Sequence, residues 1–141
     1  MADKICFTVA EAWEESISLV VQAHSQVACA VSRVTVSLPA LQELRGEIQA
    51  FLQEGDLETY WESDIPGLGL TPCITMKWIP DASRDHVLLD LYMELDDGGD
   101  FSRHTCSFYI HCTRDQLKKF SEMLRKTNLM INGMSFSLEG I

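Results

Sequence analysis

The stretch ELDDGGDFSRHTCSFYIHCTRDQL, residues 94–117, concentrates side-chain types that do chemistry in proteins. Its imidazoles and thiols are the donor types of a zinc site, and its carboxylates are the donor types of a calcium site. A thiol beside an imidazole is also the pair used in nucleophilic catalysis. The residues concerned are His104, His111, Cys106 and Cys112, together with the acids Asp96, Asp97 and Asp100.

The expected local structure separates the zinc donors. Residues 104–112 alternate as a β-strand does, and successive side chains of a strand point to opposite faces. His104 then shares a face with Cys106 and Cys112, whereas His111 lies on the other face, so the four donors do not converge on one ion. The two thiols accompany apolar side chains, where a free cysteine acts as a small hydrophobe. We expect no metal.

The acidic residues 96–100 predict a hairpin turn rather than a calcium loop. Gly98 and Gly99 stand where calcium ligands would be required, and glycine with aspartate is typical of tight turns. A turn can be structural and still be presented to a partner. We therefore expect this tip to add negative charge to a binding surface.

The sequence carries little that indicates catalysis. It lacks GxSxG, a P-loop, GxGxxG, HExxH and the HxE with PCxxC pattern, so each common motif-bearing enzyme class lacks its chemical apparatus. The acid-rich stretch EGDLETYWESD, residues 54–64, could in principle hold a general acid and base, but a solvated acidic loop is the commoner origin of such a run. We expect a protein that is not an enzyme and that has no cofactor.

The elements that position these residues follow from hydrophobic periodicity. Two passages run from strand alternation into helical spacing: one begins at Val34 and is stopped by Gly55, and the other leads into a helix over 113–127. Thr113 and Gln116 form a capping box for this second helix. Further strands are expected within 16–36, over 73–79, 86–95 and 104–112, and in a C-terminal hairpin turning at Asn132 and Gly133.

These elements predict an α+β fold formed by residues 1–141 as a single domain. We expect a single, mostly antiparallel sheet of about five to seven strands with two helices packed on it. The two strand-to-helix passages also overlay at identical offsets, which indicates a strand-strand-helix pseudo-repeat, although any strand leading into an amphipathic helix gives a similar pattern. The matched residues are Ser37, Leu41, Leu44 and Ile48 with Thr113, Leu117, Phe120 and Leu124.

Charge indicates the kind of partner. The chain has 21 acidic and 11 basic residues, a formal net charge of −10, which disfavours nucleic-acid binding because phosphate contacts need clustered Lys and Arg. A basic protein partner suits this field. The early sequence shows no signal-peptide pattern and no apolar run that spans a bilayer. Five cysteines without CxxC spacing indicate reduced thiols, so we expect a cytoplasmic protein that does not bind membranes.

Aromatic residues among these acids mark the expected partner surface. Tyr and Trp anchor interfaces, and surrounding acid steers a cationic partner. The first choice of surface is the acidic tip and the polar face of the strand that leads to it: Asp96, Asp97, Asp100, Asp90, Glu94, Tyr92 and Tyr109. The alternative is the acidic loop around the tryptophan: Glu58, Trp61, Glu62 and Asp64.

The passage HVLLDLYMELDDGGDFSRHTCSFYIHCTRDQLKKFSEMLRK resembles the small immunity proteins of bacterial polymorphic-toxin and contact-inhibition systems, particularly the WapI-type group. The likeness covers about residues 16–127 and includes the strand that ends in a helix start from Thr113 to Leu117. The resemblance implies a cytoplasmic acidic inhibitor that blocks a basic toxin domain, often a nuclease. A small enzyme or ligand-binding domain with a pocket between sheet and helices, and an oligomerisation or adaptor module, stay open as alternatives.

Overall fold

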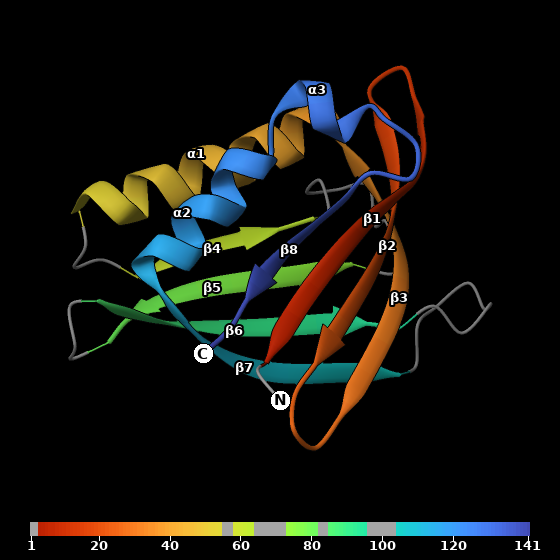
Figure 1. Cartoon of the computed structure of the whole chain (residues 1–141). Coiled ribbons are helices and arrows are strands. Elements are labelled where there is room, and N and C mark those ends of the chain that lie inside the picture. Colours follow the sequence, from red (N-terminus) through yellow and green to blue (C-terminus); the bar gives the residue numbers. More distant parts are fainter. Residues whose placement is uncertain (1–2, 55–57, 64–72, 82–84, 96–103) are drawn as a thin grey trace.

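The computed structural model describes residues 3–54, 58–63, 73–81, 85–95 and 104–141, which form two antiparallel sheets and an adjoining group of helices (Figure 1). The first sheet has the strand order β3 (Cys29–Ser37), β2 (Ser16–His24), β1 (Lys4–Trp13) and β8 (Ser135–Glu139). The second sheet has the order β4 (Thr59–Glu62), β5 (Ile74–Pro80), β6 (His86–Glu94) and β7 (Thr105–Thr113). The helices are α1 (Leu38–Glu54), α2 (Arg114–Met123) and the single turn α3 (Lys126–Leu129).

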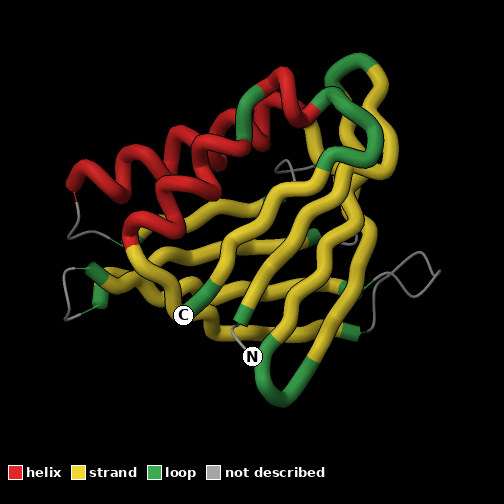
Figure 2. Tube along the Cα trace, viewed as in Figure 1, coloured by secondary structure: helices red, strands yellow, loops and turns green. Residues whose placement is uncertain are grey.

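The α+β class, the antiparallel pairing and the two main helices are confirmed, but the prediction of a single sheet of five to seven strands is wrong. Four strands form each of two sheets, and these sheets face each other with crossed strand directions (Figure 2). The inner face of each sheet is apolar, so each buries the face of the other. Local sequence patterns do not mark β1 or β4 as strands, and the remaining strands by themselves suggest only one layer.

The C-terminal hairpin expected at Asn132 and Gly133 is also wrong. Gly133 does turn the chain, with φ of +84°, but β8 then pairs with β1 at the other end of the chain, where Phe136 stands opposite Phe7. Two bonds fix this turn against β1: the Asn132 side chain accepts the Ala12 N–H at 3.0 Å, and the Gly133 N–H donates to the Val9 carbonyl at 2.7 Å.

The core lies between the two sheets and under the helices. Alternate residues of each long strand point inward, as the burial of β6 shows, because Val87, Leu89, Leu91 and Met93 are all 0% exposed. Strand β1 contributes every second residue from Ile5 to Val9 in the same way. The outward residues between them remain open to solvent, which is the alternation expected of sheets that are covered on one face.

Both strand-to-helix passages have the predicted local structure. Strand β3 runs directly into α1 and β7 runs directly into α2, and each junction is capped by a hydroxyl. Ser37 Oγ accepts the Ala40 N–H at 3.1 Å, and Thr113 Oγ1 accepts the Gln116 N–H at 3.1 Å. The apolar positions matched by the sequence overlay are all buried: Leu41, Leu44 and Ile48 in α1, Leu117 and Phe120 in α2, and Leu124 directly after α2.

The second helix is shorter than the predicted 113–127. It ends at Met123, because Leu124 leaves the helical conformation with φ of −82° and ψ of 41°. The one-turn helix α3 follows, and the Leu129 N–H bonds to the Arg125 carbonyl at 3.0 Å. This break turns the chain back toward β1, which lets β8 enter the first sheet.

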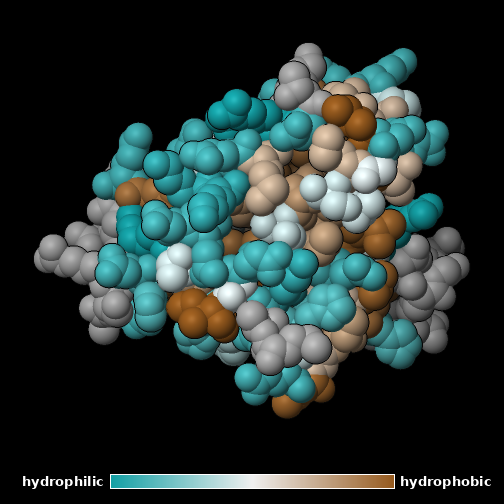
Figure 3. Space-filling view, viewed as in Figure 1, coloured by the Kyte–Doolittle hydropathy of each residue, from teal (hydrophilic) through white to brown (hydrophobic). Residues whose placement is uncertain are grey.

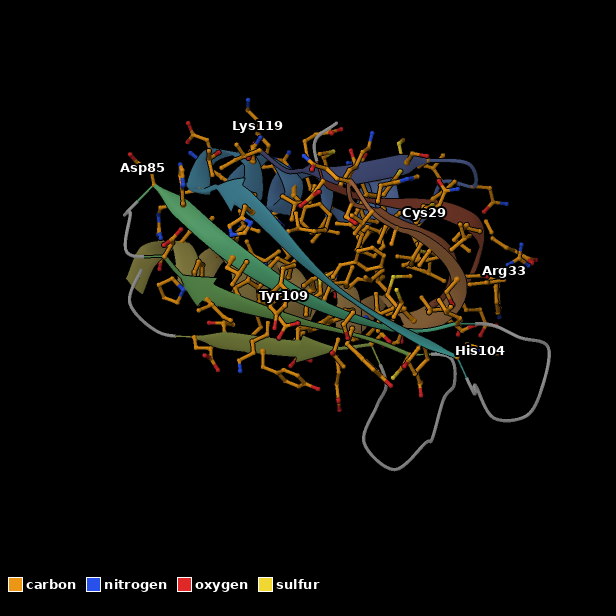
Figure 4. All side chains as sticks on the ribbon, turned by 90° about the horizontal axis from the view of Figure 1, so that it is seen from below. Cys29, Arg33, Asp85, His104, Tyr109 and Lys119 are labelled. Carbon is orange, nitrogen blue, oxygen red and sulfur yellow. The ribbon has the colours of Figure 1, made fainter. Side chains whose placement is uncertain are left out.

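The helices lie beside the two packed sheets and do not cover the outer face of the second sheet. In Figure 3, hydrophilic residues dominate over α1 and α2, and apolar residues are more frequent on the side of β1, β2 and β3. Figure 4 looks at the outer face of the second sheet, where no described helix lies in front of the strands. Within the described part of the chain, no helix is long and apolar enough to cross a membrane.

Candidate functional site

The outer face of the second sheet carries all three tyrosines of the chain. Tyr60 on β4 is 55% exposed, Tyr109 on β7 is 60% exposed, and Tyr92 on β6 is half-buried. Tyr109 stands near the middle of this face in Figure 4. Exposed aromatic residues that gather on one face are a common property of protein interfaces.

The strand register arranges these residues in rows. Tyr60 pairs with Lys77, Lys77 pairs with Asp90, and Asp90 pairs with Tyr109, so one row crosses all four strands. Directly opposed side chains of antiparallel strands lie about 5 Å apart at Cβ, so their contacts are fixed by the sheet rather than by loops. The neighbouring row consists of Glu62, Thr75, Tyr92 and Ser107.

Acidic residues outnumber basic ones on this face. Lys77 is the only Lys or Arg within the four strands, and its Nζ pairs with Glu58 Oε1 at 2.8 Å. The bond to Glu58 and the charge of that carboxylate raise the pKa of Lys77 above its ordinary value, with a further contribution from Asp90. Glu62 and Glu94 add to the negative charge of the same surface, which we call the tyrosine–acid face.

The hydroxyls of Tyr60 and Tyr92 on this face are protonated donors. Tyr60 donates to Glu62 Oε2 at 3.0 Å, and partial burial followed by this bond raises the pKa of Tyr60. Partial burial and the charge of Glu94 likewise raise the pKa of Tyr92. Both phenols therefore keep their protons at neutral pH; the Tyr60 hydroxyl donates its proton to Glu62 and can accept a bond from a partner, whereas the Tyr92 hydroxyl can donate one.

Glu94 also has a structural contact. Its Oε1 accepts the Cys73 N–H at 2.8 Å, and its own N–H donates to the Cys73 carbonyl at 2.9 Å. These bonds hold the start of β5 against the end of β6. The Glu94 charge therefore has a fixed place at one end of the tyrosine–acid face.

The structure joins two groups of residues that the sequence analysis treated as alternatives. The residues that lie on or beside the outer face of the second sheet are Asp90, Glu94, Tyr92 and Tyr109 from the first group and Glu58 and Glu62 from the second. The predicted tip residues Asp96, Asp97 and Asp100, and the loop residue Asp64, lie outside the described residues. The surface that remains is a sheet face rather than a hairpin tip.

Trp61 requires a correction, because it does not lie on a surface. Its side chain is 3% exposed, and its indole Nε1 donates to the Ala40 carbonyl of α1 at 3.0 Å. The acidic stretch around it is the strand β4 and not only a loop, so Trp61 points inward while Tyr60 and Glu62 point outward. Alternation over Thr59–Glu62 was the signal that identifies Tyr60, and not Trp61, as the exposed aromatic residue.

The thiols differ in their exposure. Cys112 is fully buried, and burial raises its pKa to about 12, so it stays protonated and unreactive at neutral pH. Cys106 is half-buried rather than fully inward, and Cys29 is exposed. Among the described residues no group of three or more His, Cys, Asp or Glu side chains could hold a metal ion.

A shallow groove lies between α2 and β8. Its volume is about 360 Å³, and its lining includes Gln116, Lys119 and Met123 from the helix and Ser137 and Glu139 from the strand. Glu139 also forms an ion pair with Lys4, with 3.1 Å between Nζ and Oε1. A ligand site between sheet and helix, the alternative considered above, would lie in this groove. However, the charged groups of the groove lie near solvent and not in a protected pocket.

Comparisons with family models, with curated proteins and with solved structures give no match. The geometry and charge of the tyrosine–acid face are therefore the basis from which function is inferred.

Proposed function

We propose that this chain is a non-catalytic protein-binding domain whose tyrosine–acid face binds a basic protein. The observation that supports the proposal is the placement of Tyr60, Tyr92 and Tyr109 in two adjacent rows of an exposed sheet face, among four carboxylates and one lysine. Such a face has the aromatic anchors of an interface and the charge of a surface that attracts cations.

The aromatic residues supply the binding energy in this proposal. Tyrosine buries a large apolar area at low conformational cost, and its truncation at interface centres typically costs 2 kcal/mol or more, of the order of 30-fold in affinity. Tyr109 lies on the last strand of the sheet and Tyr60 on the first, at opposite ends of one row. A partner that touches both therefore spans the width of the sheet.

The acidic residues supply speed and selectivity. A net charge of −10 repels other acidic proteins and accelerates the approach of basic ones, and this acceleration weakens as salt is added. In the most specific form of the proposal, the partner is a basic toxin domain, in some cases a nuclease. Binding of this chain then neutralises the toxin in the cytoplasm. That form follows from the resemblance to WapI-type immunity proteins and is part of the proposal.

The test compares two charge variants with the same net charge. Glu58→Gln, Glu62→Gln and Asp90→Asn together remove three carboxylates from the face, whereas the control replaces three exposed glutamates elsewhere by glutamine. The control residues are Glu11, Glu43 and Glu122. Either variant changes the formal charge from −10 to −7, because three negative charges are lost.

Each variant is immobilised and used to capture basic proteins from lysate, and association rates of any captured protein are measured at low and high salt. We expect the face variant to slow association strongly and the control to slow it little. Equal rates for the two variants would show that only the overall charge matters, and the proposed surface would be wrong.

An aromatic pair of variants tests the anchors separately. Tyr109→Ala removes an exposed ring from the face, and Trp13→Ala removes an exposed ring from β1, where the side chain is 46% exposed. We expect faster dissociation of the captured protein from Tyr109→Ala alone, with both variants unfolding at about the wild-type temperature. Loss of binding by Trp13→Ala alone would place the interface on the first sheet.

A further inference from the structure

Among the strands that the structure describes, β7 forms an edge of the second sheet, because the sheet order ends there. Its exposed residues alternate with buried ones: Thr105, Ser107, Tyr109 and His111 face outward on the tyrosine–acid face. The edge strand of a sheet presents unpaired backbone N–H and C=O groups and is a template for pairing with another chain.

The hydrogen bonds show which backbone groups point toward that edge. The Leu95 N–H donates to the His104 carbonyl at 2.8 Å, and the Arg114 N–H donates to the Asp85 carbonyl at 2.9 Å. Both pairs belong to the same β6–β7 register, so the even-numbered residues of β7 bond to β6. The odd-numbered residues, Thr105, Ser107 and Tyr109, therefore direct their backbone groups away from the sheet.

One backbone group of this edge already bonds to a segment of the same polypeptide that lies outside the sheet. The Ile141 N–H donates to the His111 carbonyl at 2.8 Å, and His111 is the next odd-numbered residue of β7. The edge groups are therefore oriented so that a neighbouring backbone can use them. Within the described chain, no such bond reaches Ser107 or Tyr109 from outside the sheet.

Strand β7 also lacks the features that usually block edge pairing. Proteins protect open edges with proline, charged side chains such as lysine, or bulges. The strand reads TCSFYIHCT and has no proline, no Lys, Arg, Asp or Glu, and a continuous register with β6. Nine residues with alternating exposure are long enough to pair with an extended segment.

We propose that an extended segment of a basic protein pairs with β7 and continues the second sheet as an added strand. This inference rests on the proposed function, because it names how the basic partner binds the tyrosine–acid face. The added strand takes the free N–H and C=O groups of Thr105, Ser107 and Tyr109, and its outward side chains extend the two rows that contain the tyrosines.

The rows determine the sequence of such a segment. A residue opposite Tyr109 joins the row of Tyr60, Lys77 and Asp90, and a long cationic side chain there can lie on the tyrosine ring and reach toward Asp90. The inward residues of the segment follow the layer of Phe108 and Ile110, which is apolar. The segment therefore alternates basic and apolar residues.

A second copy of the chain is the rival occupant of this edge. Two copies pairing through β7 would bring two tyrosine–acid faces, each next to Asp90 and Glu94, into one continuous surface, and each copy carries a net charge of −10. Like charges disfavour that arrangement, whereas a basic segment relieves the charge. A heteromeric pairing is therefore the one that the electrostatics support.

The test uses a synthetic peptide that alternates arginine and valine, with acetylated and amidated ends, and two isomers that carry the same number of backbone N-methyl groups. One isomer is methylated on its arginines and the other on its valines. In antiparallel pairing, the residues that exchange bonds with β7 stand directly opposite its outward residues, so they are the arginines. Binding is followed by NMR shifts and by amide exchange at Ser107 and Tyr109.

We expect the unmethylated peptide to slow exchange of the Ser107 and Tyr109 amides at millimolar concentration. The arginine-methylated isomer should lose this protection and bind at least tenfold more weakly, and the valine-methylated isomer should keep it. Selective loss with the valine-methylated isomer would support parallel pairing at the same edge. Equal binding of the two isomers, no protection by any peptide, or protection caused by a dimer of the protein itself would overturn the inference.

Two further variants separate this inference from the proposed function. Ser107→Pro removes one outward N–H of the edge, and Ser107→Ala keeps it, so only the proline variant should lose protection. The face variant with Glu58→Gln, Glu62→Gln and Asp90→Asn should weaken all three peptides alike. If the two isomers bind differently and the face variant has no effect, edge pairing is supported and the charge-based function is wrong. If the two isomers bind equally and the face variant weakens both, the charge-based function is supported and edge pairing is wrong.

Discussion

Replacing Phe120 by alanine tests how the helices are joined to the first sheet. The Phe120 ring on α2 is 1% exposed, and its centroid lies 5.7 Å from that of Phe7 on β1 and 6.1 Å from that of Phe136 on β8. Phe7 and Phe136 stack on each other at 5.3 Å with 8° between their planes. Removing the third ring leaves a cavity against a paired aromatic surface that the sheet register holds in place.

The magnitude follows from burial and from the lost ring contacts. A buried Phe→Ala change costs about 3–5 kcal/mol in unfolding free energy, and the two aromatic neighbours place Phe120 in the upper half of that range, because such pairs add about 0.5–1.5 kcal/mol each. We expect a loss of about 4 kcal/mol. For an m-value of about 2 kcal/mol/M, the urea midpoint falls by about 2 M.

The assay is equilibrium urea unfolding followed by tryptophan fluorescence and by circular dichroism. Phe120→Leu serves as the matched control, since a leucine fills most of the space and should cost about 1 kcal/mol. Lys119→Ala, on the exposed side of the same helix, should change the free energy by less than about 0.5 kcal/mol. A loss below about 1 kcal/mol for Phe120→Ala, or equal losses for alanine and leucine, would refute the packing of α2 on β1 and β8.

Three other predictions follow from local geometry. Thiol labelling of the native protein should be fast at Cys29 and slow at Cys112. Because burial raises the Cys112 pKa from 9.0 to about 12, the unfolding free energy should fall as pH rises from 9 toward 12. Cys112→Ala should remove that part of the pH dependence in an alkaline denaturation series. Trp61→Phe should cost about 0.5–1.5 kcal/mol in urea unfolding, because the bond from the indole N–H to the Ala40 carbonyl is lost, and no loss would mean that water replaces the indole N–H. Gly140→Ala should destabilise the protein, since a Cβ there would lie 2.5 Å from the Asp3 carbonyl oxygen. Gly46→Ala, in open space on α1, should stabilise it by about 0.5–1 kcal/mol. A higher melting temperature for Gly140→Ala than for Gly46→Ala would contradict the close contact between Gly140 and Asp3.

Local patterns in the sequence predicted the elements that have their own periodicity and caps. The helix that begins after Thr113 carries a complete capping box, and its Leu117 and Phe120 are buried as the spacing indicated. The alternation of β6 likewise predicted which residues face the core. In each case the pattern lies within one helical turn or one strand, so residues close together in the sequence are enough to predict the element.

Pairing between distant segments was the part that local patterns could not supply. Strand β1 contains Ala10, Glu11 and Ala12 near a register shift that follows Val9, so its alternation is interrupted where it would have been recognised. The Asn132–Gly133 signal is a real turn, but whether the following strand pairs with the preceding segment or with β1 is decided by long-range bonds. One sheet was therefore predicted where there are two.

The candidate surface divides in the same way. Alternation correctly placed Tyr92, Asp90 and Tyr109 on one face of their strands. That Glu58, Tyr60 and Glu62 border the same face depends on β4 pairing with β5, and a four-residue strand inside an acidic run gives little local signal. Composition alone made this segment resemble a solvated loop.

The pairing of β1 with β8 has a consequence for the order of events during synthesis. Strands β1, β2 and β3 leave the ribosome before the other described elements and can form a meander at once, whereas β8 is made after all of them. Until then the side of β1 that will receive β8 is open, and the Phe7 ring lacks its stacked partner. The newly made chain therefore carries an exposed strand edge until β8 is synthesised, at a stage when such edges favour aggregation.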